Sequence, residues 1–173
     1  YNYEENGFQV LVLKPQIDTK AGNMIISRVG MTRKVDFLIQ KNDNILKRLR
    51  DKLENISCIF VDEVQFLSKR QIDELFLLTK IIDVTVICYG LRTNFKAESF
   101  EGSKRLLELS DELDELITIC RCGKRAKFNA RFINDKFTLK GDTNLIDGSV
   151  SNVKYIPLCG KCYLDEKRKY EEE

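Results

Sequence analysis

The chain has 173 residues, which is enough for one core domain with a small appendage. Its net charge of +2 is nearly balanced, so composition gives no support for a nucleic-acid or membrane partner. No apolar run approaches a membrane span and no signal peptide is visible, so we expect a cytoplasmic protein. Because the sequence contains no histidine, a Ser-His-Asp triad and any imidazole metal ligand are excluded.

The first half of the chain alternates between apolar runs and helical periodicity. Residues 8–13 (FQVLVL) predict a strand, and residues 15–40, with glycines and mixed charge, predict a loop-rich segment. Apolar residues recur at helical spacing between Asp43 and Asn55. The apolar run 58–61 then predicts a second strand.

The same alternation continues to residue 119. Ser68 predicts the N-cap of a helix that runs to Ile82. Strand, helix and strand are then predicted in turn, at residues 84–89, 103–113 and 116–119. Apolar strands that alternate with amphipathic helices predict an α/β fold, with a mostly parallel sheet covered by helices on both faces.

The pattern changes after Cys120. Segments 127–132 and 136–140 flank Asn134-Asp135, which indicates a hairpin. A polar loop and a charged tail follow, and the tail is either a solvated helix end or disordered. We therefore predict an α/β core over 1–119, a small second domain over 120–164 and a tail over 165–173.

Asp62 and Glu63 directly follow the apolar run 58–61. In parallel α/β sheets, ligands bind beyond the carboxyl ends of the strands. One hypothesis is that one carboxylate coordinates Mg²⁺ at a nucleotide while its neighbour transfers a proton. The alternative is that both simply begin a loop and face water, or cap the next helix.

The six cysteines fall into two groups. Cys58 and Cys88 lie inside apolar strand-like runs and are interpreted as buried core thiols. The other four form a CxC pair and a CxxC pair, which suits a tetrahedral structural Zn²⁺ site, although incidental thiols remain the alternative. The four predicted zinc ligands are Cys120, Cys122, Cys159 and Cys162.

Read together, VDEVQF at 61–66, GLRTNFKAESF at 90–100 and two cysteine pairs around a hairpin resemble the zinc-containing type of thymidine kinase. LVLKPQIDTK at 11–20, with SRVG behind it, extends the resemblance over nearly the whole chain. The resemblance implies phosphoryl transfer from ATP to the 5′-hydroxyl of thymidine. It also implies a RecA-like (P-loop-like) α/β domain, a small zinc-bearing lasso domain and a homotetramer.

The resemblance also implies roles at the strand end. Glu63 matches the general base toward the 5′-hydroxyl, and Asp62 matches the acidic residue that serves Mg²⁺ and nucleotide. The remaining residues implied to serve the nucleotide and its Mg²⁺ are Val64, Gln65, Asp18 and Lys20.

Further residues match the family's thymidine pocket. Its implied apolar wall consists of Phe66, Leu91, Phe95 and Phe100, with Phe100 as the stacking partner of the base. Tyr155 matches the lasso, and Asn129 falls where the family usually has Thr or Ser. From the residues alone, Phe95 and Phe100 would be interpreted as ordinary core packing.

Besides Asn129, the sequence departs from the family at its phosphate-binding loop and at two charged residues. It contains no GxxxxGK[ST] loop, which supplies backbone amides, a Lys and a hydroxyl to the nucleotide, so we expect such a loop to precede Tyr1. Arg92 stands where the family usually has Asp, and Lys20 replaces an Arg.

Two other functions compete with a kinase. One is a catalytically inactive, zinc-stabilised nucleotide-binding protein of the same fold. The other is a zinc-ribbon module for nucleic acid, which the balanced charge disfavours.

Overall fold

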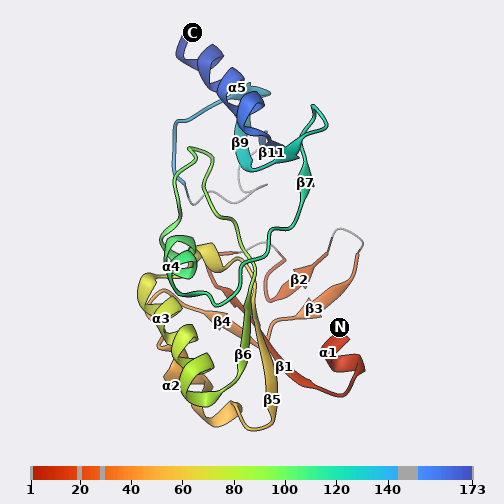
Figure 1. Cartoon of the computed structure of the whole chain (residues 1–173), viewed down its shortest axis with the longest axis vertical. Helices are drawn as coiled ribbons and strands as arrows, with labels where there is room; N and C mark the ends of the chain where they lie inside the picture. The colour runs from red at the N-terminus through yellow and green to blue at the C-terminus, as the bar shows by residue number, and fades with distance from the viewer. Residues whose placement is uncertain (1, 19–20, 28–29, 144–151, 173) are drawn as a thin grey trace. The chain divides into compact units, whose positions relative to one another are not determined.

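The structure is a computed structural model that describes residues 2–18, 21–27, 30–143 and 152–172 (Figure 1). The chain divides into two compact units. The first contains Tyr1–Leu91 with Glu101–Asp111, and the second contains Arg92–Phe100 with Glu112–Glu173. The predicted boundaries at residues 119 and 164 stay predictions, because compactness alone does not define an independently folding domain.

A four-stranded parallel sheet organises the first unit. Its spatial order is β4 (Phe37–Ile39), β1 (Gln9–Pro15), β5 (Ile56–Val61) and β6 (Thr85–Cys88). All three strand pairings are parallel, which places the carboxyl ends of the strands along one edge. The three strands predicted for this region are confirmed, and so is the mixed α/β class.

Helices cover the apolar face of this sheet. They are α2 (Ile45–Leu49), α3 (Lys69–Leu77) and α4 (Glu101–Leu109). Ile59 and Val61 of β5 are fully buried in the core cluster to which all three helices contribute. Because side chains alternate along a strand, Phe60 points to the other face, where Tyr3 of α1 (Asn2–Glu5) packs edge-on against it.

The predicted cap of α3 is confirmed. Ser68 Oγ accepts a hydrogen bond from Gln71 N, and the Gln71 side chain accepts one from Ser68 N, which is a capping box. The helix continues as a π-helical segment over Leu78–Ile82, so the predicted extent to Ile82 is also confirmed.

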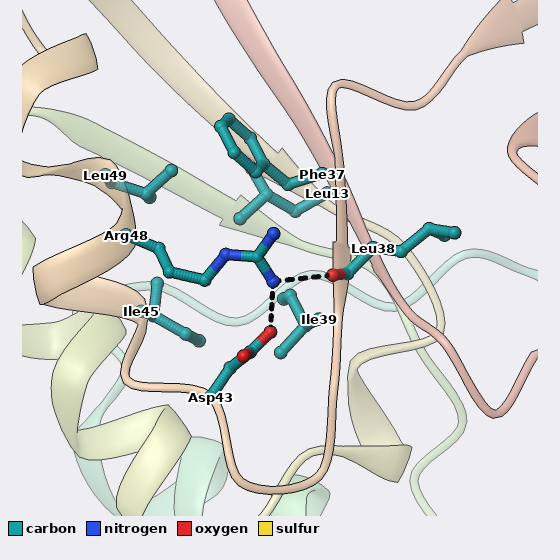
Figure 2. Close-up of a pocket in the computed structure, with 8 residues that line it drawn as sticks. All are labelled: Leu13, Phe37, Leu38, Ile39, Asp43, Ile45, Arg48 and Leu49. Carbon is teal, nitrogen blue, oxygen red and sulfur yellow. Dashed lines mark hydrogen bonds and ion pairs between the residues drawn. The ribbon is translucent and has the colours of Figure 1, made fainter.

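A cavity of about 10 Å³ is lined mainly by apolar side chains of β1, β4 and α2, which Figure 2 shows as sticks. Arg48 spans it, and its guanidinium donates to Leu38 O at 3.2 Å and pairs with Asp43. A space of that size holds one water molecule at most, so it is a packing gap of the core and not a substrate site.

The segment predicted as a loop at 15–40 contains three short strands. β2 (Met24–Ile26) and β3 (Thr32–Lys34) pair antiparallel, and β4 joins the edge of the parallel sheet. Each of these strands is only three residues long and none alternates cleanly between apolar and polar residues. The sequence therefore carried no strand periodicity that could reveal them.

An antiparallel sheet and one long helix organise the second unit. The sheet has the order β10 (Lys136–Phe137), β9 (Phe128–Ile133) and β11 (Val153–Leu158). Asn134 and Asp135, with φ of 50° and 61°, form the tight turn between β9 and β10, so the predicted hairpin is confirmed. Helix α5 (Gly160–Glu172) contains most of the charged tail.

Residues 116–119 were predicted to form a strand of the parallel sheet, and this prediction is wrong. Only β7 (Thr118–Ile119) is a strand, and it pairs antiparallel with β8 (Arg125–Ala126) instead of joining the parallel sheet. Leu116 and Ile117 are 79% and 67% exposed, so the apolar run is not a buried strand. Among the described residues, no helix is both long and apolar enough to cross a membrane.

Candidate functional site

The two acidic residues lie at the carboxyl end of β5, with their backbone held by both neighbouring strands. Asp62 N donates to Leu13 O of β1 at 2.9 Å, and Val64 N donates to Tyr89 O, just past β6, at 3.0 Å. Asp62 and Glu63 are both half-buried. Neither carboxylate is therefore fully exposed to bulk water.

Glu63 adopts a left-handed backbone conformation, with φ 50° and ψ 35°. For a residue with a Cβ this costs about 1–2 kcal/mol, so the surroundings must hold it in place. Gln65 Nε2 donates to Glu63 Oε2 at 2.5 Å, and Gln65 Oε1 accepts from Leu91 N at 3.1 Å. A Cβ on Gly90 would lie 2.5 Å from Gln65 Oε1, so only glycine leaves room for this arrangement.

Asp18 and Lys14 complete the charged group at this edge of the sheet. Lys14, which is 1% exposed, forms an ion pair with Asp18 at 2.8 Å. Burial raises the pKa of Asp62, and the nearby Asp18 raises it further, whereas Glu63 N–H and Lys14 lower it. Carboxylate oxygens in a group whose negative charge is only partly balanced suit a hard cation such as Mg²⁺, which Asp62 and Asp18 could hold.

Four cysteines of the second unit converge on one point. Their Sγ atoms all lie within 4.8 Å of one another, although Cys120 and Cys122 are far in sequence from Cys159 and Cys162. Gly123 N donates to Cys120 O at 2.8 Å and closes the turn that carries the first pair. In a tetrahedral zinc site, Zn–S bonds of about 2.3 Å place the sulfurs about 3.8 Å apart. The Cys122–Cys159 separation of 3.5 Å agrees with such a site, so the cluster could hold a metal ion.

The ionisation of these thiols also fits a cation. Backbone amides of Cys122 and Cys159 lower the pKa of Cys120 to about 6. Hydrogen bonding to Cys122 and burial raise the pKa of Cys162 to about 12. Without a cation the four thiols therefore resist being charged together, whereas a bound metal ion stabilises all four thiolates.

A sequence model of the thymidine kinase family matches residues 1–163. The chain belongs to the thymidine kinase family. Thymidine kinase of Haemophilus influenzae is 37% identical over 169 residues, which cover 96% of this chain and 86% of that protein. The thymidine kinases of Coxiella burnetii and Enterobacteria phage T4 are 38% and 37% identical, and each match covers 93% of this chain and 83% of the relative.

Several thymidine kinase residues expected from the sequence meet in the first unit. Gln65 hydrogen-bonds to both Glu63 and the Leu91 amide, and Asp62 is influenced by Asp18. Leu91 is 44% exposed, and its carbonyl accepts from Ser103 Oγ at 2.6 Å.

The remaining expected residues of the first unit differ in how deeply they are buried. Val64 is buried in the core, and Phe66 is half-buried at the end of the 3-10 turn Val64–Phe66. Lys20 lies outside the described residues, so its predicted role stays a prediction.

The other expected thymidine contacts lie in the second unit. Tyr155 pairs with Arg131 across β9 and β11, and Asn129 lies two residues before Arg131, so these side chains share one face of the sheet. Phe100 is half-buried and directly precedes α4, whereas Phe95 is buried, with only 2% exposure.

Three buried polar residues were missed in the sequence. They are Lys14, which pairs with Asp18, Arg131, which stacks on Phe95, and Tyr163, which hydrogen-bonds to Phe95 O. Lys14 stands directly before a proline at the end of an apolar run, which gave a weak signal of a strand-end residue. Arg131 belongs to a run, Arg131-Phe132-Ile133, that also resembles the family, but nothing in the sequence marked the partners of Arg131 or Tyr163, because these are distant along the chain.

Proposed function

We propose that this member of the thymidine kinase family transfers the γ-phosphoryl group of ATP to the 5′-hydroxyl of thymidine. The observation that carries the proposal is the half-buried Glu63 carboxylate at the end of a parallel strand, oriented by Gln65. A fixed carboxylate within hydrogen-bond reach of a hydroxyl can accept its proton. Strand ends of this kind are where α/β folds bind their ligands.

In the proposed reaction, Glu63 accepts the proton of the 5′-hydroxyl while that oxygen attacks the γ-phosphorus of ATP. The bond between the γ-phosphorus and the β,γ-bridging oxygen breaks, ADP leaves, and the proton passes from Glu63 to solvent. Magnesium bound with ATP would offset the charge that develops on the phosphoryl oxygens. Asp62 and Asp18 are the proposed residues for that ion, and Val64, Gln65 and Lys20 are assigned to the same nucleotide loops.

Thymine has flat apolar faces and a polar edge, which suit aromatic side chains and polar groups respectively. We assign Phe66 and Leu91 of the first unit to its contacts. From the second unit we assign Phe95, Phe100, Asn129 and Tyr155, with Phe100 stacking on the base.

The finer properties of the protein are also proposals. The cluster of Cys120, Cys122, Cys159 and Cys162 would hold a structural Zn²⁺, with no part in the chemical step. We further propose a homotetramer that acts in the cytoplasm. Native mass spectrometry reports both the subunit number and about one zinc per chain.

Replacing the proposed base tests the function. Glu63→Gln in the full-length protein should lower kcat by about 100- to 10,000-fold, because the amide cannot accept the proton. Thymidine binding, measured by calorimetry, should change less than twofold. Glu54→Gln, the same change at an exposed position, is the matched control and should keep wild-type turnover. Near-normal turnover of Glu63→Gln would reject the assignment, and a wild-type protein that binds ATP but forms no thymidine phosphate would support the inactive alternative.

A further inference from the structure

The segment 92–100, here called the Phe95 loop, is organised by its own hydrogen bonds. Asn94 Oδ1 accepts from Lys96 N at 2.9 Å and from Glu98 N at 3.1 Å. Asn94 N donates to Glu98 O at 2.8 Å, and Thr93 and Ser99 form an antiparallel bridge below the turn. These bonds fix the shape of the loop but not its attachment to the rest of the unit.

Phe95, near the tip of this loop, is anchored at two of its groups. The Tyr163 hydroxyl donates to the Phe95 carbonyl at 2.6 Å. The Arg131 guanidinium lies 3.5 Å from the centroid of the Phe95 ring. The two anchors come from α5 and β9, which are distant from the loop in sequence.

Arg131, the partner of the Phe95 ring, is itself deeply buried. It is 0% exposed, and Nη1 donates to Asp142 O at 2.8 Å. Within the described residues, Nε and Nη2 have no hydrogen-bond partner. A desolvated guanidinium is attracted to the face of an aromatic ring, so the Phe95 ring compensates part of the cost of burying it.

The position of the Tyr163 hydroxyl is set by the metal-binding region. Tyr163 directly follows Cys162 on α5, and its N–H donates to Cys159 O at 3.0 Å. Its ring is 4% exposed, stacks on Phe128 with centroids 5.0 Å apart, and meets the edge of Phe137 at 5.7 Å. The hydroxyl therefore has little freedom to leave the Phe95 carbonyl.

We propose that Tyr163 and Arg131 are positioning residues that attach the Phe95 loop to helix α5 and strand β9, and thereby set the affinity for thymidine. The inference rests on the proposed function, which assigns Phe95 and Phe100 to contacts of the base. A loop that is already ordered loses less conformational freedom when a ligand binds, so anchoring it favours binding. Neither residue touches the reacting atoms in this proposal.

The first experiment removes the anchor and little else. Tyr163→Phe keeps the ring that packs on Phe128 and Phe137 but leaves the buried Phe95 carbonyl without its donor. The KM for thymidine should rise about fivefold to tenfold, while kcat and the KM for ATP stay within twofold of wild type. Tyr170→Phe is the matched control, because Tyr170 lies on the same helix and contacts the Phe137 ring. It should leave all three constants unchanged.

The second experiment does not depend on activity. Hydrogen–deuterium exchange of the full-length Tyr163→Phe protein should show the amides of Lys96, Ala97 and Glu98 exchanging at least tenfold faster than in wild type. Exchange in β5 and the zinc content should stay unchanged, which distinguishes release of the loop from general destabilisation.

The outcomes separate the two proposals. If wild-type protein phosphorylates no thymidine but Tyr163→Phe releases the loop, the anchor stands and the proposed function fails. If wild type is a thymidine kinase and neither exchange nor the thymidine KM changes in Tyr163→Phe, the anchor fails. Equal increases in the KM values for thymidine and ATP would also reject it.

Discussion

The carboxylates of the first unit and the thiols of the second both gather groups of like charge, but the chain supports them differently. Around Asp62 and Asp18 it provides the buried cation of Lys14, and the Glu63 amide donates to Asp62 Oδ1 at 3.0 Å. Around the four cysteines the thiol pKa values diverge, from about 6 at Cys120 to about 12 at Cys162. The chain itself therefore balances part of the charge of the first group, whereas a bound cation would stabilise the second.

The largest effect is expected at the proposed zinc site. Cys159→Ser should abolish stoichiometric zinc binding and lower the unfolding midpoint of the second unit by more than about 10 °C. The apolar cluster beside the cysteines is small, so it replaces little of the lost metal-binding energy. Zinc content by native mass spectrometry and a thermal melt measure both effects.

Cys88→Ala is the matched control for that prediction. Cys88 also loses a thiol in this variant, but it lies on β6 in the first unit, outside the cluster. It should keep about one zinc per chain. Full zinc occupancy in Cys159→Ser, or loss of zinc in Cys88→Ala, would contradict the assignment of the site.

An intermediate effect is expected where the chain itself orients a carboxylate. Gln65→Met keeps the size of the side chain but removes its bonds to Glu63 and to the Leu91 amide. We expect kcat to fall about 10- to 100-fold, which corresponds to about 1.4–2.8 kcal/mol, because Glu63 loses its fixed direction. Steady-state kinetics with saturating ATP and thymidine measure this change.

Gln71→Met separates orientation from stability. Gln71 is as buried as Gln65, at 2% exposure each, and it donates to Gln40 O at 2.8 Å. This variant should lose stability but retain kcat within about threefold, because Gln71 contacts no proposed catalytic group. Equal losses of kcat in the two variants would show that Gln65 acts only through stability.

The same two regions show what could be predicted from the sequence. Apolar runs predicted β1, β5 and β6, and Ser68 predicted the start of α3, because each signal is local. The run at 116–119 was equally apolar but lies largely exposed and pairs with β8. Apolar composition indicates a strand, but it does not identify the strand's partner or the element that covers it.

The residues of the candidate site also fall into those that a local motif predicts and those that it does not. Asp62, Glu63 and the cysteine pairs were predicted as site residues because neighbouring residues form a motif. Lys14, Arg131 and Tyr163 were missed because their partners are brought close only by the fold. The hydrogen bond from Tyr163 to Phe95 joins residues 68 positions apart, and no local spacing encodes it.

The smallest expected effect is a change in stability on removing the negative charge of Asp62. Its size measures how completely the chain compensates that charge. Burial and Asp18 raise the pKa of Asp62 above that of the unfolded chain, so the folded protein binds this proton more tightly. The charged Asp62 therefore costs stability above its folded pKa, and the cost disappears as pH falls through that pKa.

Asp62→Asn removes this charge while the side-chain oxygen can still accept from Glu63 N. In EDTA at pH 7 it should raise the melting temperature by about 1–3 °C, and the gain should vanish as the pH is lowered toward about 4. The same change at Asp114, which is exposed, should give no such pH-dependent gain. A loss of stability in Asp62→Asn at every pH would mean that Lys14 and the backbone amides already compensate the charge fully. The difference in charge compensation between the carboxylates and the thiols would then be greater, since only the thiolates would lack compensation from the chain itself.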